Sequence, residues 1–98
     1  MEEKEQQIKE LLKACGMRAF VDYLFPALSK DINLTVLEMS RICPEYNGFS
    51  ANAQNTRLSK ARTIFKNGWE YDALEIIAKS SRVPVDVRLK ARELIDKA

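Results

Sequence analysis

The sequence predicts an all-α fold, a single small orthogonal bundle of about five to six short helices. Apolar residues recur at the helical spacing, and no segment alternates apolar and polar residues as a half-buried strand does. Gly and Pro are scarce, with three of each, as expected for a helix-rich chain. The chain has 98 residues, of which 46% are hydrophobic. This content is sufficient for one hydrophobic core, and the chain is too short to form two domains. We therefore expect residues 1–98 to form one helical domain.

The first two helices are expected before residue 26. One covers 3–15, and Gly16 follows it where a C-terminal cap belongs. Its apolar face is formed by Ile8, Leu11, Leu12 and Cys15. Residues 1–7 are strongly polar, and such chain ends tend to fray. The second helix runs from Met17 to about Phe25, because Pro26 is expected to end or kink it.

A third helix is expected to begin at Val36. Thr35 and Glu38 have the spacing of a capping box, in which the Thr hydroxyl accepts from the Glu amide and the Glu carboxylate reaches back. The helix should end near Ile42, since the residue before Pro44 is disfavoured in the helical region.

Three further helices complete the prediction. Ser50 is a good N-cap for a helix over 51–66, which Asn67 and Gly68 close. The fifth helix is expected over 69–80, and the sixth follows Pro84, which is favourable in a first turn. The predicted core consists of Phe20, Val21, Leu24, Leu37, Ile42, Leu58, Phe65, Leu74, Ile77, Leu89 and Leu94.

The charge distribution distinguishes the helix over 51–66. The whole chain has 16 basic and 14 acidic residues, a net charge of +2. Between Glu45 and Glu70 there is no acidic residue. The basic residues of this stretch are Arg57, Lys60, Arg62 and Lys66, a local charge of +4. A solvated helix face usually mixes lysine with glutamate, because opposite charges four residues apart stabilise it.

The polar side of this helix has the composition of a nucleic-acid recognition helix. Amide, hydroxyl and cationic side chains reach base edges and phosphates, whereas carboxylates repel the backbone. The leading hypothesis is therefore a non-enzymatic, regulatory module that binds nucleic acid, most simply duplex DNA. The predicted nucleic-acid-binding residues are Asn52, Asn55, Thr56, Ser59, Lys60, Arg62 and Lys66. We expect Arg57 to run along the core boundary to an acid instead.

Two observations weigh against the sharpest form of this hypothesis. The third and fourth helices follow one another as in a helix-turn-helix, but their connection, 44–50, exceeds the usual three or four residues. The pI near 8.6 is also lower than nucleic-acid modules tend to have, so an ordinary exposed basic helix remains an alternative. Within the connection, Tyr46, Asn47 and Phe49 are further candidates for contact with a partner.

A second hypothesis is a protein-interaction or adaptor module. Its pattern is the spacing of Ala61, Ile64, Gly68, Ala73, Ile77 and Pro84. This pattern is similar to a tetratricopeptide helical hairpin over about one repeat. The resemblance implies a groove among the last three helices that holds a peptide or protein. The simpler interpretation is two antiparallel helices packed through Leu58, Ala61 and Ala73.

Composition disfavours an enzyme. The chain has no His, the most common general base and metal ligand, and we identify no catalytic residue, metal site or cofactor. Cys15 and Cys43 are expected to be buried free thiols. No apolar run approaches the roughly 20 residues that span a bilayer, and the acidic start is unlike a secretory signal. The expected location is cytoplasmic, and a homodimer is compatible with a duplex reader.

Overall fold

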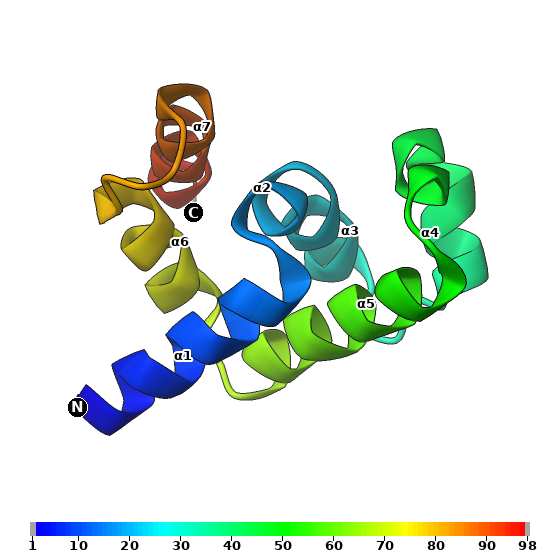
Figure 1. Ribbon diagram of the computed structural model, residues 1–98, viewed down its shortest axis with the longest axis horizontal. Helices are drawn as coiled ribbons and strands as arrows, with labels where there is room; N and C mark the ends of the chain where they lie inside the picture. Colours follow the sequence, from blue (N-terminus) through cyan, green and yellow to red (C-terminus); the bar gives the residue numbers. More distant parts are fainter. Residues whose placement is uncertain (1, 98) are drawn as a thin grey trace.

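The computed structural model describes residues 2–97, except for the side chains of Glu2, Tyr46 and Asn47. It contains helices and no strand within these residues, so the predicted all-α fold is confirmed (Figure 1). The helical elements are α1 (Glu2–Cys15), α2 (Met17–Ala19), the π-helical η1 (Phe20–Leu24), α3 (Phe25–Lys30), α4 (Val36–Ile42), the 3-10 helical η2 (Pro44–Gly48), α5 (Ala51–Lys66), α6 (Glu70–Lys79) and α7 (Val85–Asp96). The described part of the segment predicted to fray belongs to α1. The proposed partner contacts of Tyr46 and Asn47 lie outside the described side chains.

Two helix pairs make the most extensive contacts of the bundle. Helix α5 packs along α1, and α6 packs along α7 (Figure 1). The expected hairpin of α5 and α6 is therefore wrong as the main packing of either helix, although Gly68 does join them with a φ of 72°. The reason is that the buried face of α5 packs against the apolar face of α1. The spacing of apolar residues within 61–84 cannot predict this contact, because α1 lies outside that segment.

Residues 17–30 form one continuous helical segment through α2, η1 and α3. The prediction that Pro26 ends this helix is wrong, because the helical segment continues to Lys30, and it does so through an irregular π turn directly before the proline. In the π turn, the Phe25 N–H donates to the Phe20 carbonyl, five residues back. A proline ring clashes with the carbonyl four residues earlier in a regular helix, and a wider turn before it relieves this clash. The segment therefore passes Pro26 without breaking.

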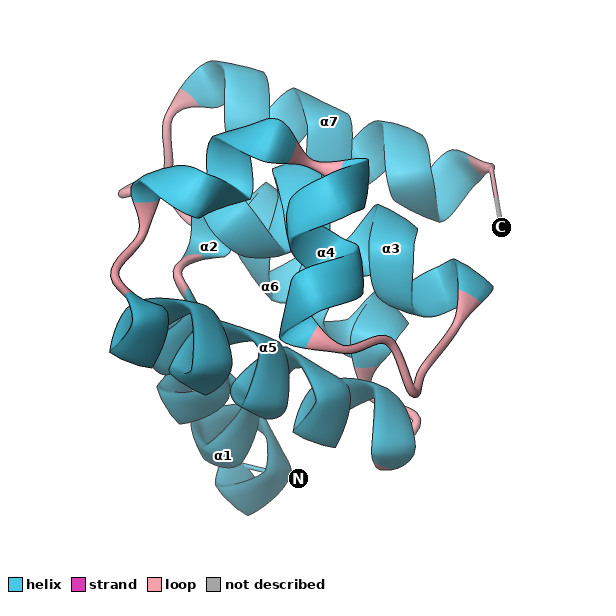
Figure 2. Cartoon of the chain, turned by 90° about the vertical axis from the view of Figure 1, so that its right-hand side faces the viewer, coloured by secondary structure: helices cyan, strands magenta, loops and turns pink. Residues whose placement is uncertain are grey.

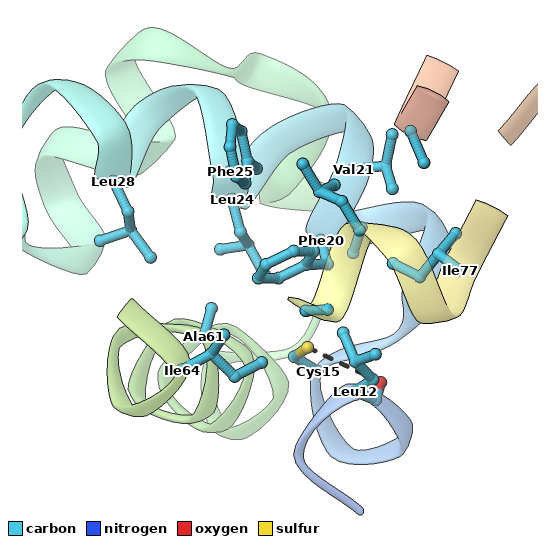
Figure 3. Packing of buried hydrophobic residues seen from close by; sticks show 14 of the residues in the cluster. Leu12, Cys15, Phe20, Val21, Leu24, Phe25, Leu28, Ala61, Ile64 and Ile77 are labelled. Atoms are coloured by element: carbon cyan, nitrogen blue, oxygen red, sulfur yellow. Dashed lines mark hydrogen bonds between the residues drawn. The ribbon is translucent and has the colours of Figure 1, made fainter. Parts of the chain in front are cut away.

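The core is one hydrophobic cluster to which every α-helix contributes. Figure 3 shows Leu12 of α1, Ala61 of α5 and Ile77 of α6 around Phe20 of the π turn. Of the predicted core, the buried residues are Phe20, Val21, Leu24, Leu58, Leu74 and Ile77. Phe65 and Leu94 are half-buried and pack against the cluster.

Three predicted core residues are exposed instead. Leu37 is 64% exposed, Ile42 57% and Leu89 65%. The buried residue of α4 is Met39, and the buried residues of α7 are Val87 and Ala91. Each of these helices carries apolar residues on two sides, and only one side meets the bundle.

The capping predictions are confirmed at two helices. The Thr35 hydroxyl accepts the Glu38 N–H at 3.2 Å, and α4 begins at Val36. The Glu38 carboxylate accepts from the Thr35 hydroxyl at 3.1 Å, so it reaches back to the cap side chain. The Ser50 hydroxyl accepts the Ala53 N–H at 3.2 Å, which starts α5. These caps are stabilising because they satisfy amides that have no partner within the helix.

Candidate nucleic-acid interface

The outward side of α5 carries the predicted site. The buried residues Leu58, Ala61 and Ile64 hold the helix against the core, which leaves the opposite side facing solvent. The exposed site residues are Asn52, Asn55, Thr56, Ser59, Lys60 and Lys66, whereas Arg62 is half-buried. One face of a single rigid helix therefore presents amides, hydroxyls and two lysines together.

A shallow groove of about 470 Å³ runs beside this face. It lies between α5 and the segment that leads into α4. Its lining residues are Asn33, Thr35, Val36, Asn55, Leu58, Ser59, Arg62 and Lys66. None of these is acidic, so the groove has polar walls, an apolar contribution from Leu58 and a positive charge. The sequence did not indicate Asn33 and Thr35, because their approach to α5 is a tertiary contact.

Arg62 has a role that the sequence interpretation missed. Its Nε donates to the Ile32 carbonyl at 2.8 Å, and its Nη2 donates to the Leu34 carbonyl. The guanidinium thus fastens the segment before α4 to α5 and forms one wall of the groove. A signal was present, because Arg62 follows Leu58 by four residues and so lies beside it on the helix.

The two lysines of the face are not neutralised within the described residues. Neither Lys60 nor Lys66 forms an ion pair with a described carboxylate. Glu10 lines a second hollow together with Lys60, between α1 and α5, without forming an ion pair with it. The outward side of α5 therefore remains positively charged at both ends of its C-terminal half.

Arg57 lies on the inner edge of α5, as its position on the helical wheel predicts. Its Nη1 donates to the Cys15 carbonyl at 2.5 Å, and its guanidinium carbon lies 4.3 Å from the centre of the Phe49 ring. It therefore meets a carbonyl and an aromatic ring rather than the expected acid. Gly16 has a φ of 85°, and a Cβ there would collide with the same guanidinium. Arg57 thus joins the middle of α5 to the end of α1.

The cysteines are free thiols, as predicted. Cys15 is completely buried, and burial raises the pKa of its thiol to about 12. Cys43 is only half-buried, and burial together with the nearby Glu45 carboxylate raises the pKa of its thiol. No cluster of metal-ligating side chains occurs among the described residues. Within 2–97, none of the helices is both long and apolar enough to cross a bilayer.

Comparison of the chain with protein-family models, curated proteins and solved structures finds no match. The chemistry of the α5 face is therefore the basis for assigning a function. That face combines amides and hydroxyls with two cations, and no carboxylate lines the groove beside it.

Proposed function

We propose that this protein is a non-enzymatic module that binds nucleic acid, specifically duplex DNA, through the outward face of α5 and the groove beside it. The observation that supports the proposal is the pair of lysines, Lys60 and Lys66, which have no acidic partner among the described residues. Phosphate contacts by such cations supply most of the sequence-independent affinity for DNA.

The face divides into residues with different roles in the proposal. Lys60 and Lys66 contact phosphates, and Asn52, Asn55 and Ser59 contact base edges. The Asn55 amide donates to the Ala51 carbonyl at 3.1 Å in the free protein, so it has to rotate to pair with a base. Thr56 lies between these groups as a further hydroxyl donor.

Arg62 acts differently from the original expectation. Its guanidinium already binds two carbonyls of the segment before α4. We therefore assign it a positioning role, in which it holds the wall of the groove, rather than a contact with guanine.

The proposal is tested by fluorescence anisotropy of a labelled random-sequence duplex at low salt, where phosphate-driven affinity is strongest. We expect measurable binding, and a loss of at least about tenfold in Lys60→Glu/Lys66→Glu. The matched control is Lys79→Glu/Lys97→Glu, which changes the net charge equally but reverses lysines already paired with Glu75 and Glu93. Absence of binding at low salt, or equal losses in both double variants, would refute the proposal.

A protein-interaction module is the second candidate. It is favoured by the exposed apolar side chains of Val85 and Leu89, which lie four residues apart on α7. In this case, Leu89→Asp abolishes capture of the partner, whereas Lys60→Glu/Lys66→Glu leaves it intact. A pull-down with the two variants in parallel distinguishes the candidates.

A further inference from the structure

Helix α4 has an outward face that the bundle does not use. Its inward side consists of the buried Met39 and the half-buried Val36 and Ser40, and the half-buried Cys43 follows directly after the helix. Its outward side consists of Leu37, Glu38, Arg41 and Ile42, all exposed. Figure 2 looks at the molecule from the α4 side and shows this helix toward the viewer, with no other element of residues 2–97 in front of it.

This outward face combines two large apolar side chains with two opposite charges. Leu37 is 64% exposed and Ile42 is 57% exposed, and both have the apolar character that led us to expect burial. These two side chains flank the face as single exposed apolar residues, which are ordinary on a protein surface, so they supply apolar area but do not by themselves identify a partner. The identity of the occupant follows from the two charges between them.

Read from either end of the helix, this face has an apolar residue, two charged residues and a second apolar residue. The two charges are opposite, so reversing the direction exchanges their signs. At about 100° per residue, Glu38 and Arg41 lie near the centre of the face, and Leu37 and Ile42 lie at its flanks. When a second copy packs antiparallel, Glu38 of each copy lies at the level of Arg41 of the other. Leu37 of each copy then lies at the level of Ile42 of the other. A parallel copy would instead oppose like charges. A two-fold interface requires a patch that is complementary to itself, and this face satisfies that requirement.

Neither charge is already neutralised by an ion pair. Glu38 and Arg41 form no ion pair with another described residue, although the Glu38 carboxylate accepts from the Thr35 hydroxyl. The face is therefore available for charge complementarity with a partner. The groove on α5 borders this face, because Thr35, whose hydroxyl donates to the Glu38 carboxylate, lines the groove together with Val36.

We propose that this protein forms an antiparallel homodimer through the outward face of α4, with Leu37 and Ile42 buried between the copies and Glu38 paired with Arg41 of the second copy. A helix of seven residues buries less than the roughly 1,200–2,000 Å² of a stable interface. The dimer is therefore weak and depends on protein concentration. The inference does not rest on nucleic-acid binding.

Sedimentation equilibrium tests this dimer between about 10 μM and 1 mM, the range in which a small interface associates. The weight-average mass of the wild type is expected to rise from the monomer value of 11.2 kDa toward twice that mass. Leu37→Asp is expected to weaken association by more than about tenfold, because it places a carboxylate in the contact of each copy. The matched control is Leu89→Asp, which changes an equally exposed leucine on α7 and should leave the mass curve unchanged.

A charge-reversal pair tests the antiparallel arrangement. Glu38→Arg alone makes the face wholly basic, and Arg41→Glu alone makes it wholly acidic, so each variant should remain monomeric. An equimolar mixture of the two should form a heterodimer, because every opposed pair is then oppositely charged. Thermal unfolding of each variant verifies that α4 remains folded, since the Glu38 N–H bond to Thr35 does not need the carboxylate.

Three results would overturn the proposal. The first is a wild type that keeps the monomer mass throughout the concentration range. The second is loss of association in Leu89→Asp but not in Leu37→Asp, which would place the contact on α7 instead. The third is a mixture of Glu38→Arg and Arg41→Glu that does not associate.

Discussion

Helix α5 and the α6–α7 pair each contain four basic residues, but they differ in what those residues contact. In the α6–α7 pair, Lys79 and Arg92 both pair with Glu75 at 3.4 Å, and Lys90 reaches Asp22 of the π turn at 3.4 Å. In α5, Arg57 and Arg62 donate to backbone carbonyls, and the two lysines have no described ion pair.

The difference separates charges that serve the fold from charges that are left for a partner. The Glu75 carboxylate pairs with Lys79 of α6 and Arg92 of α7, so it connects the two helices and offsets part of their positive charge within the chain. The arginines of α5 hold neighbouring segments in place through hydrogen bonds, whereas its two lysines form no described ion pair. A surface whose cations contribute nothing to stability is the expected location for an anionic ligand.

The largest expected effect comes from the inward side of α5. Ile64→Ala removes a fully buried side chain and should lower the free energy of unfolding by about 2–5 kcal/mol. Ser59→Ala, on the outward side, should change it by less than about 0.5 kcal/mol. Urea denaturation of both variants measures the contrast, and similar losses would show that the outward side also belongs to the packing.

The next test compares two arginines. Arg62→Ala should destabilise the protein by about 1.5–3 kcal/mol, because two carbonyls lose a charged donor in a partly buried site. Arg92→Ala breaks a largely exposed pair with Glu75 and should cost less than about 1 kcal/mol. Both are measured by chemical denaturation. An Arg62 variant as stable as the Arg92 variant would contradict the positioning role.

The third test uses pH to probe the α1–α5 interface. The pKa of Cys15 is raised from 9.0 to about 12 in the folded protein, so folding favours the neutral thiol. Its contribution is fully present below pH 9 and is lost as pH rises toward 12, by roughly 1.4 kcal/mol per pH unit. We expect the stability of the wild type to fall more steeply from pH 9 to 10 than that of Cys15→Ala. Parallel curves would show that this thiol is not shielded.

The smallest effects separate paired from unpaired surface charges. Glu75→Gln removes two exposed ion pairs and should lower the free energy of unfolding by less than about 1 kcal/mol, with a smaller loss in high salt. Lys66→Gln should leave stability within about 0.5 kcal/mol at any salt concentration. Thermal denaturation at two salt concentrations provides the measurement. A salt-dependent loss in Lys66→Gln would reveal a hidden acidic partner.

The sequence predicted the parts of the fold that local chemistry decides. The starts of α4 and α5 follow from Thr35 and Ser50, whose hydroxyls reach amides three residues away. The end of α5 follows from Gly68, which adopts a positive φ. Each of these signals lies within one turn of the feature that it determines.

The sequence predicted less where a distant segment decides. Leu37 and Leu89 belong to helices with apolar residues on two sides, and only the tertiary packing selects the side that is buried. The partners of Arg62 are carbonyls near residues 32–34, about thirty positions earlier in the chain. The candidate face on α5 could be located from charge alone, but its groove and the duty of Arg62 required the structure.

The π turn at Phe20–Leu24 sets a limit on how this chain can change in length. Such a turn holds one residue more than an α-helical turn, and its greater width makes room for the Pro26 ring. Loss of one residue there would return the turn to α-helical geometry, in which the ring clashes with the carbonyl four residues earlier, and the helix would break before the buried Leu28. Point replacements that preserve volume are tolerable at these positions. Deletion of a single residue within the π turn should therefore destabilise the fold more than most point substitutions do.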